Sequence, residues 1–447
     1  MADLDAIFKA YDVRGTVPDQ LDADTSRAIG AAFGRFLADT EGADRVVVAH
    51  DMRPTGPEYS EAFADGVRGQ GVDVVRMGLA STDMLYFASG HLGVPGAVFT
   101  ASHNPAGYNG IKMCRALAAP IGADTGLGDI KQMAAAGLEP MGRPGSLSEV
   151  DLLGDFADHV RSFIDVGSLR PLRVVADTAN GMGGLVVPAV FAPLPLEVEV
   201  MYSELDGTFP NHPADPIQPE NQADLIARLL EVGADVGLAF DGDADRVFLV
   251  DETGRAVSGS LTTALVAGRV LAKEPGATVL HNLICSKAVP EVVAEHGGTS
   301  VRTKVGHSYI KADMADTGAA FAGEHSGHYY FRDNWRADSG LIASMFVLEA
   351  MSDSQASLSE LLAPIDRYAA SGEINTRVAD AGVVIDKVAA HYHDHHQDRL
   401  DGLTVDAGDW WFNLRASNTE PLLRLNLEAP DQETCEVRVA EVRALFG

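Results

Sequence analysis

The stretch Val236-Gly237-Leu238-Ala239-Phe240-Asp241-Gly242-Asp243-Ala244-Asp245-Arg246 runs from small apolar residues into an acidic loop. Its first part has the composition of a buried strand, and residues 247–250 form a second β-rich run. Alternate side chains of an extended chain share one face, so Asp241, Asp243 and Asp245 can converge on one hard cation such as Mg²⁺. A helix-flanked calcium loop is excluded, because Arg246 occupies the position where that loop requires glycine. A solvated acidic turn is the alternative.

The same arrangement, a small apolar strand that leads into a polar loop, occurs twice more in the chain. Gly96–Phe99 runs into Thr100-Ala101-Ser102-His103-Asn104-Pro105, and Gly318–Ala322 runs into Gly323-Glu324-His325-Ser326-Gly327-His328. Strand-like runs alternate with helical stretches around all three loops. We therefore expect three related mixed-sheet α/β domains, each with a functional loop at a strand's carboxyl end, where open α/β sheets bind ligands. Chance similarity among alanine-rich strands is the alternative.

The C-terminal part has a different pattern, with strand-like runs at 373–378, 410–415 and 422–427 and helical stretches at 380–393 and 432–445. This pattern predicts a smaller α+β domain. A chain of 447 residues is too long for a single core. The four domains are predicted at residues 1–148, 149–251, 252–362 and 363–447.

Composition limits the partners that the chain can have. The net charge of −30, from 34 basic and 64 acidic residues, argues against nucleic acid and requires any phosphate site to be built locally from a few cations. No apolar run approaches the roughly 20 residues of a membrane span, and the acidic N-terminus lacks the features of a signal peptide. The three cysteines lie far apart and are expected to be reduced thiols, which favours the cytoplasm.

Ser102 is a candidate phosphate carrier or nucleophile. A serine hydroxyl is a weak nucleophile and needs a base or a cation. Thr100, His103 and Asn104 offer hydrogen bonds beside it, and Lys112 falls on the following strand. A phosphoserine brings about −2 charge, which Mg²⁺ at the acidic loop could counter. An ordinary polar loop is the alternative.

Two further loops have the composition of ligand-binding segments. Glu324 and Ser326, between glycines, suit sugar hydroxyls, which both donate and accept hydrogen bonds. Arg415-Ala416-Ser417-Asn418-Thr419-Glu420-Pro421 follows a strand, and its guanidinium with three polar side chains could hold a phosphate. A glycine-rich turn and a loop ended by proline are the alternatives.

The four loops, in this order and in four successive segments, resemble the α-D-phosphohexomutase superfamily over essentially the whole chain, which implies that the four domains surround a central cleft. The bacterial phosphomannomutase/phosphoglucomutase group is most similar, on the Gly-Glu-His-Ser-Gly-His loop and Asn418. Phosphoglucosamine mutases more often carry Gln at position 325 and Gly at 418. The resemblance implies that Ser102 is phosphorylated and that Asp241, Asp243 and Asp245, with a phosphoserine oxygen, hold Mg²⁺. The phosphoryl group would pass to a hexose monophosphate, and a 1,6-bisphosphate would turn over and return its other phosphate to Ser102.

The resemblance also implies roles for other residues. Tyr11-Asp12-Val13-Arg14-Gly15 is similar to the family's N-terminal segment, and Arg14 would neutralise the transferring group. Lys112 and His328 are the candidates for proton transfer. The implied catalytic residues are Ser102, Arg14, His103, Lys112 and His328. The implied substrate-binding residues are Tyr11, Arg246, Lys287, His307, Glu324, Ser326, Arg415, Ser417, Asn418 and Thr419.

These observations predict an intramolecular phosphotransferase that interconverts the 1- and 6-phosphates of mannose, glucose or both. Glucose 1,6-bisphosphate or an equivalent is the expected activator, and hexose phosphates are the expected partners of a monomer or dimer. A phosphoglucosamine mutase of the same superfamily is one alternative. An aspartyl-phosphate sugar phosphatase with Asp241 as nucleophile is another, although Asp245 stands where such enzymes usually carry Thr or Val. A non-catalytic sugar-phosphate sensor is the third.

Overall fold

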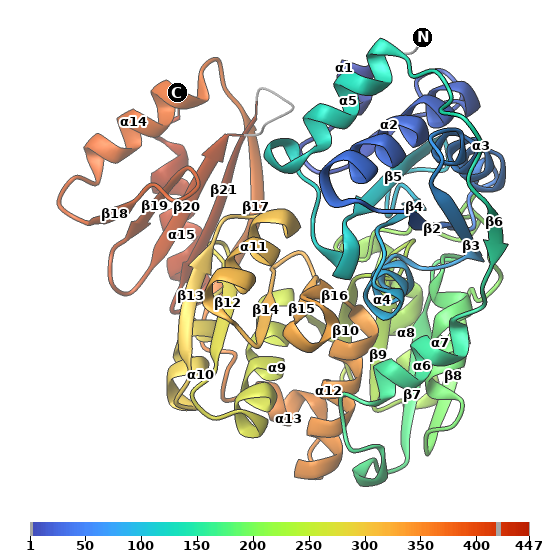
Figure 1. The fold of residues 1–447 in the computed structure, drawn as a ribbon. Coiled ribbons are helices and arrows are strands. Elements are labelled where there is room, and N and C mark those ends of the chain that lie inside the picture. The colour runs from blue at the N-terminus through green and yellow to red at the C-terminus, as the bar shows by residue number, and fades with distance from the viewer. Residues whose placement is uncertain (1–2, 417–421, 447) are drawn as a thin grey trace.

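Four β-sheets organise the residues that the computed structural model describes, which are 3–416 and 422–446 (Figure 1). The first sheet consists of β1 (Val13–Thr16), β2 (Arg45–His50), β3 (Asp73–Leu79), β4 (Gly96–Phe99), β5 (Tyr108–Cys114) and β6 (Leu147–Glu149). The second consists of β7 (Leu172–Asp177), β8 (Leu196–Met201), β9 (Val236–Phe240), β10 (Val247–Asp251) and β11 (Ala256–Val257). The third consists of β12 (Thr278–Asn282), β13 (Thr299–Thr303), β14 (Phe321–Gly323), β15 (Tyr329–Phe331) and β16 (Ala337–Asp338). The fourth consists of β17 (Ala369–Arg377), β18 (His396–Asp398), β19 (Leu403–Asp406), β20 (Trp411–Ala416) and β21 (Leu422–Ala429).

The first three sheets share one strand arrangement. Four consecutive strands lie in the spatial orders β3-β2-β4-β5, β8-β7-β9-β10 and β13-β12-β14-β15. In each set the first three strands in chain order are parallel and the fourth is antiparallel. The three polar loops connect the third strand to the fourth, so they occupy equivalent positions at a strand's carboxyl end. The prediction of three related mixed-sheet α/β domains is therefore confirmed, and the fourth sheet, which is antiparallel, belongs to the smaller α+β domain.

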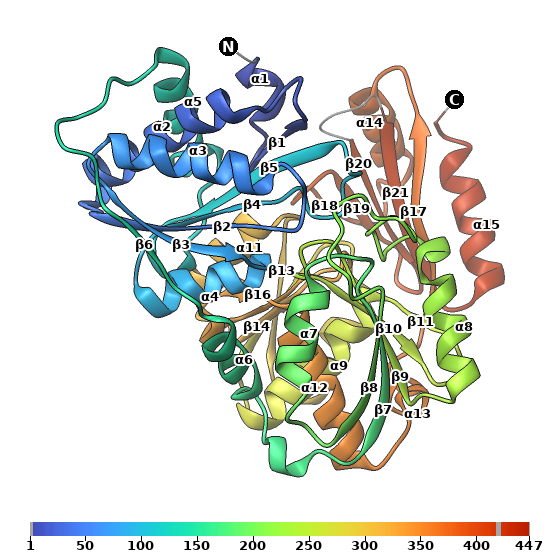
Figure 2. The same ribbon diagram turned by 90° about the vertical axis from the view of Figure 1, so that its right-hand side faces the viewer.

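Helices cover both faces of the first sheet, which explains why β2 is a continuous apolar run. Val46 and Val48 pack in one cluster with residues of α2 (Ala23–Glu41) and α3 (Gly56–Gly69), whereas Val47 and Ala49 pack in another with residues of α4 (Thr82–Leu92). Helices α2 and α3 lie on one side of this sheet and α4 on the other (Figure 2). The remaining helices are α1 (Leu4–Ile7), α5 (Leu127–Ala136), α6 (Leu153–Arg161), α7 (Gly183–Phe191), α8 (Ala223–Val232), α9 (Gly259–Lys273), α10 (Ala288–Glu295), α11 (His307–Thr317), α12 (Gly340–Ser354), α13 (Leu358–Leu362), α14 (Ala381–His391) and α15 (Gln432–Arg443). Within the described ranges, no helix combines the length and apolar character of a membrane span.

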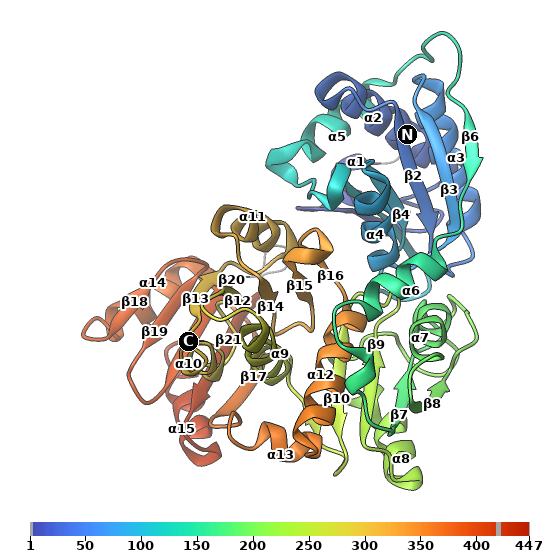
Figure 3. The same ribbon diagram turned by 60° about the horizontal axis from the view of Figure 1, so that its bottom comes forward.

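One hydrophobic core runs through the first three domains, which also have separate clusters of their own, and the fourth domain has its own core. The shared core contains Phe87 of α4, Phe156 of α6 and Phe331 of β15. Helix α12 lies between the second and third sheets, and its residues from Gly340 to Ser352 are all buried (Figure 3). The core of the fourth domain gathers aromatic and aliphatic side chains around Phe412. The first three domains thus pack as one body, to which the fourth is added; the positions of the domain boundaries stay predictions.

Asp83, in the first turn of α4, is a buried carboxylate at the junction of the first and third domains. It accepts hydrogen bonds from the hydroxyls of Ser81 and of Ser339, the latter at 2.8 Å, and it is fully buried. Burial raises the pKa of Asp83 from 3.8 to about 7. The folded protein therefore keeps a proton that the unfolded chain releases, and stability falls as the pH rises from the unfolded to the folded pKa.

We predict that Asp83→Asn makes thermal stability less dependent on pH. Between about pH 4 and pH 7 the free energy of unfolding of the wild-type protein should fall by roughly 2 to 4 kcal/mol because of this carboxyl group. The neutral amide of Asp83→Asn has no such pH dependence. Melting temperatures of the two proteins, measured across this range, check the prediction. Asp129→Asn, in the exposed first turn of α5, is the control. Parallel pH profiles for wild type and Asp83→Asn would contradict it.

Candidate active site

Ser102 lies in the β4–β5 loop and points at the acidic loop of the second domain. Its Oγ donates a 2.6 Å hydrogen bond to Asp241 Oδ2, and its backbone N–H donates to Thr100 Oγ1 at 2.9 Å. The residue is buried and has a φ of 48°, in the left-handed region that residues other than glycine rarely adopt. Such a conformation persists only where the surroundings over-determine it, so the direction of the hydroxyl is set by its neighbours.

Asp241, Asp243 and Asp245 bring carboxylate oxygens within 4.8 Å of one another, and all three residues are at most 1% exposed. The turn that joins them passes directly beside the β4–β5 loop, residues 100–107, which carries Ser102 and is called the serine loop below. A Cβ at Gly242 would lie 2.5 Å from the carbonyl oxygen of Ser102, so only glycine fits there. The convergence expected from the alternate spacing is therefore present in the structure.

Two buried cations offset this negative charge. Lys112 Nζ donates to Asp243 Oδ2 at 2.7 Å and to Asp245 Oδ2 at 2.6 Å, and Arg246 donates to Asp241 Oδ2 at 3.0 and 2.9 Å. Burial opposes the charged form of Lys112, but the two carboxylates outweigh it and hold the pKa of Lys112 well above its ordinary value. Burial also opposes the charged form of Asp243, yet Lys112 holds the pKa of Asp243 below its ordinary value.

The donor set fits a divalent cation. Asp243 Oδ1 and Asp245 Oδ1 are buried and accept no hydrogen bond. Burying carboxylate oxygens without hydrogen-bond partners costs folding free energy, so stability does not explain why these oxygens are gathered in one cluster. The three carboxylates and the Ser102 hydroxyl beside them offer only oxygen atoms as metal ligands, and Mg²⁺ prefers oxygen ligands. Asp245 also lies near His328 and Asp338 in a mixed cluster, but the buried amine of Lys311 lies 3.6 Å from Asp338 there.

Several other predicted residues surround Ser102. Arg14, on β1, donates to Asn104 Oδ1 and to Asp12 Oδ2, both at 2.6 Å. His103 Nδ1 contacts Arg246 and lies 3.3 Å from Ser102 Oγ. Burial and the Arg246 guanidinium lower the pKa of His103 to about 2, which makes the ring a neutral hydrogen-bond acceptor.

The third domain contributes His328 and Ser326 to the same region. His328 forms a backbone bridge with Arg246, its Nδ1 lies 2.9 Å from Ser326 Oγ, and its Nε2 lies 3.8 Å from Asp245 Oδ1. Glu324 faces its own domain instead, since its carboxylate accepts hydrogen bonds from the Tyr330 hydroxyl at 2.7 Å and from Asn282 at 3.2 Å.

The first and third domains also meet at Tyr11 and His307. Their rings pack edge to face with centroids 4.3 Å apart. His307 is the first residue of α11, and burial holds its pKa well below the ordinary value. The imidazole is therefore neutral where it faces the phenol.

Lys287 and Arg415 make their contacts with residues of the fourth domain. Lys287 donates to Asp406 Oδ1 and to the carbonyl of Gly408, both at 2.8 Å, and so joins the third domain to the fourth. Arg415, near the end of β20, lies 3.4 Å from Asp401 Oδ2. Three of the predicted phosphate-binding residues lie outside the described part of the chain: Ser417, Asn418 and Thr419.

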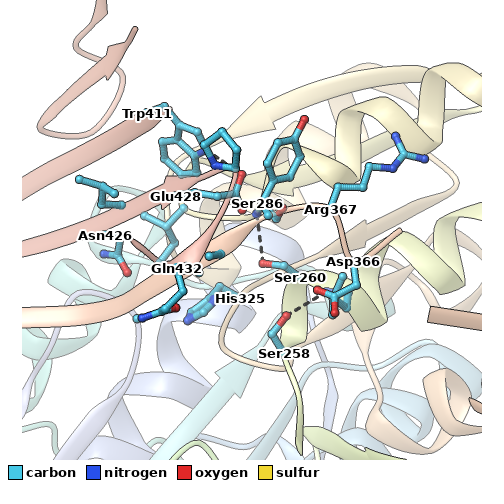
Figure 4. Close-up of a pocket in the computed structure, with 18 of the residues that line it drawn as sticks. Ser258, Ser260, Ser286, His325, Asp366, Arg367, Trp411, Asn426, Glu428 and Gln432 are labelled. Carbon is cyan, nitrogen blue, oxygen red and sulfur yellow. Dashed lines mark hydrogen bonds between the residues drawn. The ribbon is translucent and has the colours of Figure 1, made fainter. Parts of the chain in front are cut away.

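His325 faces a different space from its neighbours in the loop. It lines a cavity of about 500 Å³ between the third and fourth domains, together with Trp411, Asn426 and Gln432 (Figure 4). The side chains of Glu324, His325 and Ser326 thus make separate contacts, and His325 contributes to the domain junction.

Sequence reasoning missed two residues of the site. Thr82, at the start of α4, donates from its hydroxyl to Asp243 Oδ2 at 2.6 Å. Arg53, two residues after Asp51 at the end of β2, donates to backbone carbonyls of the serine loop. A signal existed for Arg53: β2 and β4 are adjacent parallel strands, so the polar residues after their carboxyl ends meet at one edge of the sheet. Thr82 carried no comparable signal, because its partner lies 161 positions away.

Comparisons with known proteins agree with this geometry. Models of the phosphoglucomutase/phosphomannomutase family match in chain order: alpha/beta/alpha domain I at residues 5–139, domain II at 154–254, domain III at 258–368 and the C-terminal domain at 373–445. A protein described as phosphohexose mutases from Xanthomonas campestris pv. campestris is 42% identical over 446 residues, with 98% of each chain covered. A phosphomannomutase from Salmonella montevideo is 41% identical over 455 residues, again with 98% of each covered. The crystal structure of a phosphoglucomutase/phosphomannomutase family protein from Burkholderia thailandensis superposes with a TM-score of 0.90 at 35% identity, covering 100% of this chain and 97% of that one.

We predict that Asp243→Asn lowers the affinity for Mg²⁺ or Mn²⁺ at least about tenfold, because it removes one charge from the oxygen cluster. Calorimetric titration with Mg²⁺ and the electron paramagnetic resonance of bound Mn²⁺ measure the change. Asp65→Asn on the surface of α3, which pairs only with surface arginines, is the matched control. Equal cation affinity in wild type and Asp243→Asn would show that the acidic triad, Asp241, Asp243 and Asp245, is not the cation-binding site.

Proposed function

This chain belongs to the phosphoglucomutase/phosphomannomutase family, and we propose that it carries the transferable phosphoryl group on Ser102. It is a phosphohexomutase, an isomerase that moves the phosphate of a hexose phosphate from one position to another. One observation supports Ser102 above all: its hydroxyl, from the first domain, donates to Asp241 of the second at 2.6 Å. A buried hydroxyl beside a carboxylate cluster is where a phosphoryl group and a divalent cation can meet.

The proposed reaction has two phosphoryl transfers. In the first, the phosphorus–Oγ bond of phosphoserine 102 breaks while the free 1- or 6-hydroxyl of a hexose monophosphate bonds to phosphorus and loses its proton. The resulting 1,6-bisphosphate turns over in the cleft, and its other phosphoryl group returns to Ser102. Mg²⁺ held by Asp241, Asp243 and Asp245 would neutralise charge on the transferring group. Arg14 and Arg246, which flank the serine loop, would stabilise the same charge.

Proton transfer in this scheme falls to His328. Burial, with the cations Arg246 and Lys112, holds the pKa of His328 well below its ordinary value, so the ring is neutral; to act as a general base it would need the negative charge of a phosphoryl group on Ser102 to stabilise its protonated form. Lys112 is a weaker candidate, because Asp243 and Asp245 favour its charged form. We therefore give Lys112 an electrostatic role. Ser326 would orient the His328 ring and a sugar hydroxyl together.

Mannose and glucose phosphates are the proposed substrates, on the names of the Salmonella montevideo phosphomannomutase and the Burkholderia thailandensis phosphoglucomutase/phosphomannomutase family protein. Glucose 1,6-bisphosphate, or an equivalent, would reload Ser102 after escape of the intermediate and would act as activator. Lys287, His307, Tyr11 and Glu324 remain proposed sugar contacts, and Ser417, Asn418 and Thr419 with Arg415 remain the proposed holders of the non-reacting phosphate. A cytoplasmic location is proposed from three buried cysteines that form no disulfide.

The aspartyl-phosphate alternative is disfavoured by the contacts of Asp241. Its Oδ2 accepts hydrogen bonds from Ser102 and from two nitrogens of Arg246, and its Oδ1 accepts one from the Arg246 backbone N–H at 3.2 Å, so both oxygens are already engaged within the two loops. A nucleophile must approach the reacting atom in line. Ser102 is the better carrier on this ground.

Ser102→Ala is predicted to reduce turnover more than about a thousandfold, because no other group can carry the phosphoryl. Binding of glucose 1-phosphate, measured by calorimetry, should persist. Ser148→Ala, on the exposed edge strand β6, is the control.

Wild-type kcat/KM for mannose, glucose and glucosamine 1-phosphates, measured in the same assay with Mg²⁺ and trace bisphosphate, tests the sugar preference.

Near-normal activity of Ser102→Ala would overturn the mechanism. Mass spectrometry of the wild-type protein separates the alternatives further. Phosphate on Asp241 with none on Ser102 would favour the phosphatase, and substrate binding without any interconversion would favour a sensor.

Arg415→Ala is predicted to raise KM at least about tenfold with kcat changed less than about threefold, because a guanidinium fork is lost from the phosphate-holding loop. Steady-state kinetics and the melting temperature check this outcome. Arg424→Ala is a matched control, since both arginines lie near Glu373 at 3.5 to 3.7 Å. Global unfolding of Arg415→Ala would instead make the arginine structural.

A further inference from the structure

Arg53 is a buried arginine whose side chain is bonded to the backbone of the serine loop. Its Nη2 donates to the carbonyl oxygens of Ser102 at 2.8 Å and Asn104 at 2.7 Å. Its Nη1 donates to those of Pro105 and Tyr108, both at 2.9 Å. All four acceptors lie between the end of β4 and the start of β5. The guanidinium therefore fixes the whole loop that presents the Ser102 hydroxyl.

Stability alone does not explain this arrangement. Arg53 is 1% exposed, and its ion-pair partner Asp51 lies 3.3 Å from Nε and is fully buried as well. Burying an ion pair costs desolvation free energy that well-packed apolar side chains would avoid. Three of the four carbonyl groups belong to the loop after β4 and the fourth to Tyr108, the first residue of β5, and the effect of these bonds is to give the loop a single conformation.

The carbonyl of Ser102 is the point at which this effect reaches the hydroxyl. On one side it accepts from Arg53, and on the other it packs against Gly242, where a Cβ would come within 2.5 Å. The residue keeps a left-handed φ of 48° between these contacts. Oγ is joined to the Ser102 Cα through Cβ alone. Fixing the peptide planes around Ser102 therefore fixes the direction of the Cα–Cβ bond, from which Oγ reaches Asp241.

Arg53 also contacts the second domain, which carries the acidic triad. Its guanidinium lies over the ring of Phe209, 5.1 Å from the centroid. A Cβ at Gly207 would lie 2.6 Å from the Arg53 Cα, so the two backbones are in close contact. One residue thus joins the serine loop of the first domain to a segment of the second, and it sets the distance between phosphoryl carrier and triad.

We propose that Arg53 is a positioning residue for phosphoryl transfer, which acts through the backbone of the serine loop and does not touch the substrate. The proposal rests on the proposed function of Ser102. Four acceptors around one planar cation match the fixed fork of a guanidinium, whereas a lysine amine offers three donors from a single point. A loop released from this clamp would present the phosphoserine out of line with the attacking hydroxyl and more open to water.

The test compares Arg53→Lys and Arg53→Gln with Arg68→Lys, a control that changes an arginine on the outer side of α3 bonded to one carbonyl, that of Gly145. We expect kcat for glucose 1-phosphate to fall about tenfold in Arg53→Lys and about 100-fold in Arg53→Gln, with KM within about threefold of wild type, because misplacement of a reacting group by about 1 Å costs about 100-fold. The half-life of phosphoserine 102, followed by intact-protein mass spectrometry without substrate, should shorten in the same order. The control should match wild type.

Wild-type kcat and phosphoserine half-life in Arg53→Lys would overturn the proposal. Loss of kcat that follows only the unfolded fraction, or failure of Arg53→Lys to fold, would also overturn it, since Arg53 would then serve stability. Failure of the proposed function looks different: the wild-type protein itself would carry no phosphate on Ser102 during turnover.

Discussion

Mutual repulsion among Asp241, Asp243 and Asp245 is the constraint on which the rest of this structure depends. Three carboxylates on one buried turn are tolerable only where cations and hydroxyls surround them. The second domain supplies Arg246, and the first supplies Lys112, with its two hydrogen bonds to the cluster. The acidic loop therefore requires the first domain to be docked against it, and domain packing and site formation are one event.

The division of the hydrophobic cores follows the same requirement. The first three domains share a core around α4, α6 and α12, which keeps the serine loop, the acidic loop and His328 in fixed relation. The fourth domain has its own core and meets the third through polar contacts such as Lys287 with Asp406. A rigid catalytic body with an added domain suits a reaction whose intermediate must turn between two transfers.

The charge of the whole chain and the charge of the site have opposite signs. A net charge of −30 repels hexose phosphates, yet Arg14, Lys112 and Arg246 gather around Ser102. Burial strengthens their influence, because the surrounding dielectric is low. These cations also contribute to the low pKa values of His103 and His328, which leave both rings neutral near Ser102. The net negative charge of the chain thus acts on a hexose phosphate at long range, whereas the buried cations act on it at short range.

The sequence by itself determined the repeated strand-to-loop pattern, the three related domains, the position of Ser102 and the convergence of the aspartates. These features depend on residues close together in the chain, whose directions follow from backbone geometry. Only the tertiary structure decided which partners the long charged side chains take. Lys287 turns to Asp406, Glu324 to Asn282, and Arg53 to the serine loop. Each of these contacts joins separate segments, so it exists only once the strands and domains have docked, and local sequence pattern does not encode it.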